Sequence, residues 1–113
     1  MDGSDNFATR YIVNDACIAM DKVLIYGSIF AFEGQVAVFN YKGSKNLRDI
    51  FPEPPSSEDV PSCDRFGVLG PLPGIVGSIM AMQALQVITD LAVISNHLLI
   101  FNTKSWEFAK IAF

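Results

Sequence analysis

The chain has 113 residues and a formal net charge of −4, with half of its residues hydrophobic and 18% charged. This length suits one domain with a single core and is too short for two, and the composition is far from that of a disordered chain. The eight Lys and Arg residues form no long run, which argues against a nucleic-acid-binding protein, because that class needs a basic face.

Cysteine usage and the N-terminus bear on the cellular compartment. The two cysteines, Cys17 and Cys63, form no C-x-x-C pair and do not resemble the framework of a small secreted protein. The first five residues lack the basic and apolar regions of a signal peptide. We therefore predict a cytoplasmic protein.

The first predicted element is a helix over residues 6–20. Ser4 or Asp5 is expected to cap it, because a side-chain oxygen there accepts hydrogen bonds from the first free backbone N–H groups. Its inward face is predicted from apolar residues at helical spacing, which are Ala8, Ile12, Ala16 and Ala19.

Three strands are predicted next, over residues 23–26, 28–32 and 35–41. The first is a short apolar run that suits a strand buried on both faces. Glu33 and Gly34 are expected to form the two-residue turn between the other two strands, with the glycine supplying the positive φ that such a turn needs.

A polar, proline-rich stretch covers residues 42–67. Its prolines cannot propagate a helix or a central strand, so we predict a long exposed loop. Loops of this length in a compact domain are usually functional or mobile, and a tolerated insertion is the alternative.

An apolar helix is predicted from Pro71 to about residue 90, since proline suits the first helical turn. Residues 69–94 are long and apolar enough to cross a membrane. Two glutamines and Asp90 would be costly on a lipid-facing helix, so a buried helix is favoured and a membrane segment is the alternative. Glycines at the helix start leave a smooth strip that permits close approach of another backbone: Gly70, Gly74 and Gly77.

The chain is predicted to close with a hairpin of residues 98–101 and 106–113, joined through residues 102–105. The sum is one α/β domain over residues 1–113, with an antiparallel-rich sheet and two main helices.

Three stretches carry a family resemblance. They are residues 2–17 (DGSDNFATRYIVNDAC), residues 25–36 (IYGSIFAFEGQV) and residues 61–78 (PSCDRFGVLGPLPGIVGS). Their order and spacing resemble the MoeB/ThiF/HesA family of adenylyltransferases, which are relatives of the ubiquitin-activating enzymes. The resemblance implies the C-terminal half of a ThiF-type, Rossmann-like adenylation domain.

The resemblance also implies a reaction. In this family the C-terminal glycine carboxylate of a ubiquitin-like sulfur carrier attacks the α-phosphate of ATP and releases pyrophosphate. Sulfur or a thiol partner is then transferred to the activated carbonyl. Such chemistry calls for Mg²⁺, basic side chains and backbone donors, because phosphate charge must be neutralised as the new bond forms.

Residues of the first motif receive roles from the family. The resemblance assigns Asp5 to Mg²⁺ near the ATP phosphates, whereas the pattern alone would make it a helix cap. Asn6 and Arg10 belong to the same motif and are expected to bind the nucleotide. Arg10 is expected either to position phosphate or to hold the loop through a carboxylate pair.

The remaining chemical residues are less defined. Cys63 matches a cysteine that some family members use as a nucleophile towards the acyl adenylate, and a loop cysteine without chemistry is the alternative. Cys17 is predicted to be a small core residue. His97 has no acidic or cysteine partner at ligand spacing and is predicted to be a turn residue.

The sequence also departs from the family pattern. The glycine-rich turn that binds ATP is absent, so we expect a fragment that is inactive alone. Asn46 and Asp49 stand where relatives often carry the first C-x-x-C pair of a zinc site, so we predict no zinc. ATP and Mg²⁺ are expected only with the full-length parent.

Two other functions compete with an adenylyltransferase fragment. One is a module without catalysis that binds the carrier or dimerises, and the other is a small membrane-associated protein built on residues 69–94. A homodimer is expected in either soluble case, because exposed apolar surface favours a partner.

Overall fold

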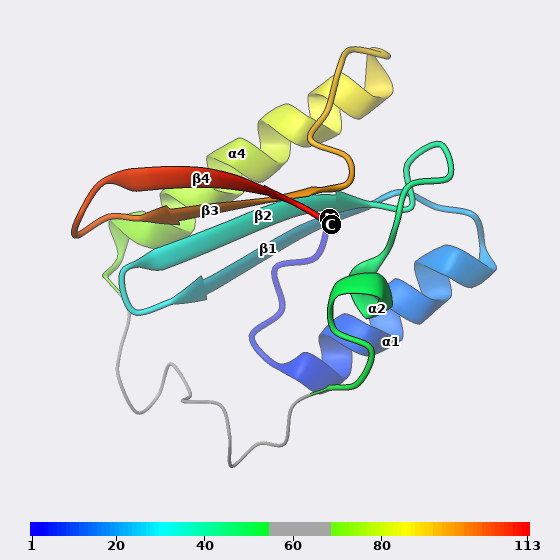
Figure 1. Cartoon of the computed structure of the whole chain (residues 1–113), viewed down its shortest axis with the longest axis horizontal. Helices are drawn as coiled ribbons and strands as arrows, with labels where there is room; N and C mark the ends of the chain where they lie inside the picture. Colours follow the sequence, from blue (N-terminus) through cyan, green and yellow to red (C-terminus); the bar gives the residue numbers. More distant parts are fainter. Residues whose placement is uncertain (55–68) are drawn as a thin grey trace.

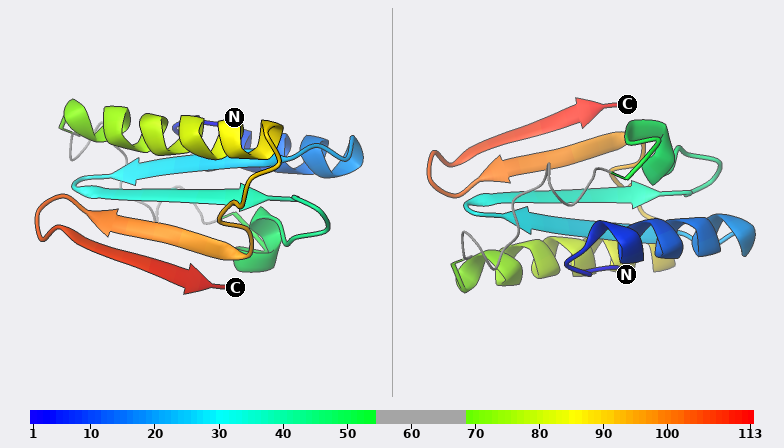
Figure 2. Two further views of the ribbon diagram at one scale, coloured as in Figure 1. Left: turned by 90° about the horizontal axis from the view of Figure 1, so that it is seen from above. Right: turned by 90° about the horizontal axis from the view of Figure 1, so that it is seen from below.

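A four-stranded antiparallel sheet in the order β1-β2-β3-β4 forms the centre of the structure, a computed structural model that describes residues 1–54 and 69–113 (Figure 1). Its helices lie on both faces of the sheet (Figure 2). This arrangement confirms the predicted α/β class with its antiparallel-rich sheet. The strands are β1 (Leu24–Phe30), β2 (Glu33–Phe39), β3 (His97–Asn102) and β4 (Glu107–Ala112), and the helices are α1 (Phe7–Ala19), α2 (Leu47–Ile50) and α4 (Pro71–Ile88).

Two hydrophobic clusters form the core, one on each face of the sheet. On one face, α1 and α2 cover a cluster that includes Tyr26 and Phe39. On the other face, α4 covers a cluster that includes Val36 and Phe101. Helices α1 and α4 lie on the β1–β2 side, α2 lies near the start of β3, and β4 is exposed along its whole length (Figure 2).

The N-terminal segment extends the sheet beyond β1. Asp2 forms a parallel bridge with Tyr26. Its N–H donates to the Ile25 carbonyl at 2.8 Å, and its carbonyl accepts from the Gly27 N–H at 3.2 Å. Both backbone edges of β1 are therefore occupied around Tyr26, and residues 3–5 lie next to the start of α1.

The first hairpin differs from the sequence prediction. Residues 23–26 and 28–32, predicted as two strands, lie largely in the single strand β1, and the turn falls at Ala31 and Phe32 rather than at Glu33 and Gly34. Ala31 adopts the positive φ of the turn, at 53°. Gly34 is instead buried in β2 opposite Phe101, so packing explains this glycine.

Helix α1 is confirmed, but its cap and its inward face are not as predicted. Asn6 caps it, accepting a hydrogen bond from the Thr9 N–H at 2.8 Å. The four residues predicted to face inward are all exposed: Ala8, Ile12, Ala16 and Ala19. The face turned to the sheet carries larger or polar side chains instead, which are Phe7, Arg10, Tyr11, Asn14 and Cys17.

The stretch predicted as a long loop contains the short helix α2. Its Leu47 is buried in the core, so this part of the prediction was wrong. Asn46 and Asp49 form a capping box, with the Asn46 N–H donating to Asp49 Oδ2 at 2.7 Å. Residues 42–46 and 51–54 of the predicted loop have no helix or strand, as predicted, and residues 55–67 lie outside the described residues.

Helix α4 ends at Ile88, two residues earlier than predicted. Its buried stripe consists of Leu72, Val76 and Met80, whereas Met82 and Leu85 are exposed. In the described part of the chain, it is the one helix long and apolar enough to cross a membrane, with 22% of its residues buried. The glycines predicted to form a smooth strip at the start of α4 are Gly70, Gly74 and Gly77. A β-carbon added at any of them would have no described atom within 4 Å.

The closing hairpin is confirmed by β3 and β4, which pair from His97 with Ala112 to Asn102 with Glu107. His97 is the first residue of β3, so its prediction as a turn residue was wrong. Trp106 takes up the positive φ in this hairpin, at 58°.

At two glycines of the first hairpin, side chains from other elements pack directly against the glycine backbone. A β-carbon at Gly34 would overlap the ring of Phe101, and one at Gly27 would overlap the Met80 sulfur. An aromatic ring cannot bend away, whereas a methionine side chain can adjust its rotamers. A side chain is therefore tolerated less well at position 34 than at position 27.

We predict that Gly34→Ala lowers the free energy of unfolding by about 1–3 kcal/mol, the usual cost of overpacking a core. Gly27→Ala should cost less, because Met80 can move. Gly74→Ala is the matched control, since a β-carbon there meets nothing and alanine favours a helix. Urea unfolding of the three variants measures the order of their stabilities. Equal unfolding midpoints for Gly34→Ala and Gly74→Ala would contradict the predicted order.

Candidate functional site

The predicted motif residues gather where the N-terminal segment meets α1. Asp2 anchors this segment on β1, and its Oδ1 accepts from the Ser4 N–H at 2.9 Å. Asp5 follows with an exposed side chain. Asn6 caps α1 and also donates from Nδ2 to Asp5 Oδ1 at 3.4 Å. Asn6 thus has a structural role here, and its predicted contact with the nucleotide stays a prediction.

Arg10 is a buried cation that holds this segment. Its side chain is 7% exposed, and its Nε and Nη2 donate to the Ser4 carbonyl at 3.3 and 3.1 Å. The guanidinium carbon lies 5.0 Å from the ring centre of Phe7 and 5.8 Å from that of Tyr26. Of the two predicted roles of Arg10, it holds the loop, but through a backbone carbonyl rather than a carboxylate. Its predicted contact with phosphate stays a prediction.

A cavity of about 330 Å³ opens beside this segment, which we call the Asp5 cavity. It lies between residues 3–5, the edge of β1 and the first half of α4. Asp5, Arg10 and Ser28 give it polar groups, and Val76 and Met80 give it an apolar wall. A carboxylate and a guanidinium thus stand at one small opening.

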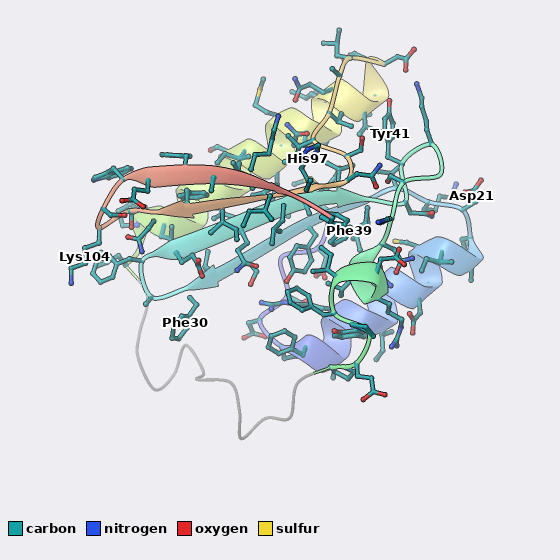
Figure 3. The ribbon with its side chains drawn as sticks, in the orientation of Figure 1. Asp21, Phe30, Phe39, Tyr41, His97 and Lys104 are labelled. Carbon is teal, nitrogen blue, oxygen red and sulfur yellow. The ribbon has the colours of Figure 1, made fainter. Side chains whose placement is uncertain are left out.

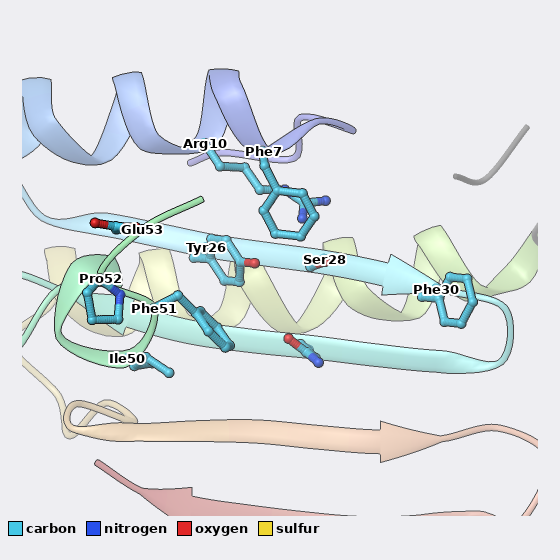
Figure 4. A pocket seen from close by; sticks show the side chains of 10 residues that line it. Phe7, Arg10, Tyr26, Ser28, Phe30, Ile50, Phe51, Pro52 and Glu53 are labelled. Atoms are coloured by element: carbon cyan, nitrogen blue, oxygen red, sulfur yellow. The ribbon is translucent and has the colours of Figure 1, made fainter. Parts of the chain in front are cut away.

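A second cavity of about 430 Å³ lies on the α1–α2 face of the sheet, which we call the aromatic cavity (Figure 4). Its size is within the range usual for ligand sites. Arg10 and Ser28 line both cavities, so the two are neighbours. Four aromatic rings, two further polar side chains and two aliphatic residues complete its lining: Phe7, Tyr26, Phe30, Phe51, Gln35, Glu53, Ile50 and Pro52.

Two polar atoms of the N-terminal segment are buried without a hydrogen-bond partner among the described residues. They are Asp2 Oδ2 and Ser4 Oγ. Buried polar groups are nearly always paired in folded proteins. The segment is therefore suited to a polar partner, either a ligand or another part of a protein.

The described residues fit a Mg²⁺ ion that is bound mainly by a substrate. In the described ranges, no three His, Cys, Asp or Glu side chains lie close enough to hold a metal by themselves. Asp5 supplies one exposed carboxylate, and Mg²⁺ is usually held by one or two carboxylates together with substrate phosphates and water. Asp5 thus fits its predicted role, which no contact in the structure tests.

The other candidate residues fall elsewhere. Cys63 lies outside the described residues, so its role as a nucleophile stays a prediction. Cys17 is half-buried and packs against the core cluster under α1, as predicted. His97 Nδ1 lies 2.9 Å from the Ser95 carbonyl, in a local backbone contact (Figure 3). The predicted absence of zinc remains a prediction.

Sequence reasoning missed the residues that line the aromatic cavity. Phe51 and Glu53 were assigned only to a loop, and Tyr26 only to a buried strand. A strand period of two does place Tyr26 and Ser28 on one face, so part of this lining was accessible from the pattern. Nothing in the sequence indicated that Phe51 would lie opposite them.

Comparison with known proteins decides the family. The profile of the ThiF family matches residues 1–112. The chain belongs to the ThiF family. Its resemblance to MoeB/ThiF/HesA proteins is thereby confirmed over nearly its whole length.

Relatives of this ThiF-family chain carry related names. It is 45% identical to the "Probable molybdopterin-synthase adenylyltransferase" of Pyropia yezoensis, over 97% of the chain and 30% of that protein. It is 43% identical to the "Sulfur carrier protein adenylyltransferase" of Thermus thermophilus, over 98% and 43%. It is 42% identical to the "Adenylyltransferase and sulfurtransferase MOCS3" of Dictyostelium discoideum, over 98% and 27%. The chain therefore spans less than half the length of each.

We predict that Arg10→Met lowers the free energy of unfolding by about 1–3 kcal/mol, because the Ser4 carbonyl loses a charged donor while it stays partly buried. Lys22→Met is the matched control, since Lys22 is an exposed cation. Urea unfolding measures both, and equal midpoints would show that the Arg10 contact contributes nothing.

Proposed function

We propose that this chain is part of an ATP-dependent adenylyltransferase that activates the C-terminus of a ubiquitin-like sulfur-carrier protein, of the thiamin or molybdopterin biosynthesis type. The observation that carries the proposal is the exposed Asp5 carboxylate beside the buried Arg10, at a cavity, in a ThiF-family chain. The names of the relatives agree with it. A cytoplasmic location fits this chemistry.

In the proposed reaction, a carboxylate oxygen of the carrier forms a bond to the α-phosphorus of ATP. The bond between that phosphorus and the bridging oxygen breaks, and the electron pair leaves with pyrophosphate. Mg²⁺ supplies neutralisation of the phosphate charge. Asp5 contributes an oxygen ligand for that ion, and Arg10 fixes the backbone from which Asp5 projects.

We assign the carrier's C-terminal segment to the aromatic cavity. This cavity shares Arg10 and Ser28 with the Asp5 cavity, so the end of a chain lying in one is close to the other. Its rings offer flat apolar walls to a slender extended segment, while Gln35 and Glu53 offer groups that can bond a peptide backbone. Cys63 is the proposed nucleophile of the next step: its sulfur bonds to the activated carbonyl carbon, the bond from that carbon to the phosphate oxygen breaks, and AMP leaves.

We infer that activity needs residues beyond these 113. A triphosphate is normally cradled by backbone N–H groups at a glycine-rich turn before a helix, and the sequence contains no such turn. Asp5 alone cannot replace it. ATP and Mg²⁺ are accordingly assigned to the longer polypeptide.

We expect Asp5→Asn to reduce ATP–pyrophosphate exchange by at least about 10²-fold in the complete protein, the order typical for loss of a group that stabilises developing charge. Asp21→Asn is the matched control, because Asp21 is exposed beyond the other end of α1. Exchange is followed with labelled pyrophosphate. Unaltered exchange in Asp5→Asn would remove this residue from the mechanism.

A second candidate function, a carrier-binding or dimerisation module without catalysis, is favoured by the free side of the sheet. Strand β4 is exposed throughout, and Trp106, Phe108 and Ile111 on or beside it are each at least half exposed. Large exposed apolar residues often mark a protein interface. A homodimer through such surface remains our expectation.

Calorimetry separates the two functions for the isolated chain. If the sheet edge docks the carrier, a ubiquitin-like sulfur carrier binds while ATP does not, and Trp106→Ala weakens carrier binding about tenfold, as a truncated aromatic anchor does. Met82→Ala on α4 is the control, because it removes a similarly exposed apolar side chain from a helix. A heat of binding with ATP and none with the carrier would contradict the hypothesis of a carrier-binding module.

A further inference from the structure

The segment that follows α2 is tied to α1 through a tyrosine hydroxyl. Tyr11, on α1, is 4% exposed. Its hydroxyl donates to the Phe51 carbonyl at 2.7 Å and lies 3.2 Å from the Glu53 carbonyl, within hydrogen-bond distance of both. Burial raises the pKa of Tyr11, and the nearby Arg48 opposes this only in part. The phenol therefore remains a donor at neutral pH.

An arginine completes the attachment. Arg48 Nη1 donates to the Pro52 carbonyl at 3.1 Å. Its Nε and Nη2 donate to the two carboxylate oxygens of Asp15 at 2.8 and 2.9 Å, and its guanidinium lies 4.8 Å from the ring centre of Tyr11. Three consecutive carbonyls, those of residues 51–53, are thus bound by side chains, and Asp15 ties Arg48 itself to α1.

These bonds matter because little else fixes residues 51–53. The segment has no regular secondary structure, and its side chains are exposed, so packing contributes little to its position. Among the described residues, its one backbone bond joins the Phe51 N–H to the Leu47 carbonyl at 2.9 Å. Yet Phe51, Pro52 and Glu53 form one wall of the aromatic cavity, across from Tyr26 (Figure 4).

We propose that Tyr11, Arg48 and Asp15 are positioning residues that hold residues 51–53 as a fixed wall of the aromatic cavity and thereby set its affinity for the C-terminal segment of the carrier. This inference rests on the proposed function. The three side chains act through the wall, since none of them lines the cavity itself. The Arg48 hydrogen bond lowers the pKa of Asp15, so the pair stays charged at neutral pH.

The decisive variant is Tyr11→Phe in the complete protein, because it removes the hydroxyl and keeps the buried ring. The KM for the carrier should rise about tenfold, as expected when the one hydroxyl donor shared by two carbonyls of a binding wall is lost. The KM for ATP and kcat should change less than about twofold, because the contacts of Arg10 and Asp5 are untouched. Asp15→Asn should shift the carrier KM in the same direction by a smaller factor.

Matched controls separate positioning from general stability. Tyr41→Phe removes a hydroxyl on the α4 side of the sheet, and Asp90→Asn breaks the exposed ion pair with Lys42, which is 2.8 Å long. Both controls should leave the carrier KM unchanged. Hydrogen exchange of the amides at residues 51 and 53 gives a second readout, and it should quicken in Tyr11→Phe but not in Tyr41→Phe.

Two results would overturn the inference. One is a wild-type carrier KM in Tyr11→Phe together with normal pyrophosphate exchange, which would leave the proposed function intact. The other is an equal rise in the KM for ATP and for the carrier, which would indicate a general loss of structure. If Tyr11→Phe does not fold, Arg48→Gln reports on the same wall from an exposed position. Absence of exchange in the wild-type protein would overturn the proposed function and this inference together.

Discussion

Burial of the first four residues of β1, Leu24 to Gly27, is the constraint on which the rest of the structure depends. Its backbone is bonded to β2 along one edge and to Asp2 at the other. Its side chains alternate between the cluster under α1 and the cluster under α4, because successive strand residues point to opposite faces. The N-terminal segment, α1 and α4 are all placed relative to this strand.

The site follows from that placement. Asp2 fixes the segment before α1 on the strand edge, and Arg10 fastens the same segment from the helix side. A buried guanidinium is costly unless it is bonded, and here a carbonyl and two aromatic rings surround it. Asp5 is exposed in this turn, as are Gly3 and Asn6, and this placement presents its carboxylate to the Asp5 cavity.

Much of the fold could be predicted from local patterns. The long apolar helix, the closing hairpin and the family itself came from periodicity, turn residues and ordered motifs. Within α1 the inward face could not be predicted from hydrophobicity. Arg10 and Asn14 lie inward because their hydrogen bonds are made there, and small alanines lie outward, where they cost nothing.

Features that depend on contacts between residues far apart in the chain could not be predicted from the sequence either. A glycine such as Gly34 can either form a turn or make room for a neighbouring ring, and the sequence alone does not distinguish these two roles. The pairing of Gly34 with Phe101 shows that it makes room for the ring. The contact of Asp15 with Arg48 joins residues 33 positions apart, with no period to signal it. For the candidate site, the motif located Asp5 and Arg10, whereas the aromatic cavity needed the three-dimensional arrangement of strand, helix and loop.

The outer strand has a consequence for how the molecule behaves at high concentration. An unpaired strand offers a row of N–H and C=O groups to any other chain, and a single well-placed lysine is a common safeguard against uncontrolled stacking into aggregates. In β4, Lys110 stands between Ala109 and Ile111 on a strand that is exposed throughout. Lys110 and Glu107 place charges of both signs on this strand, which disfavours uncontrolled pairing of its free edge with other chains.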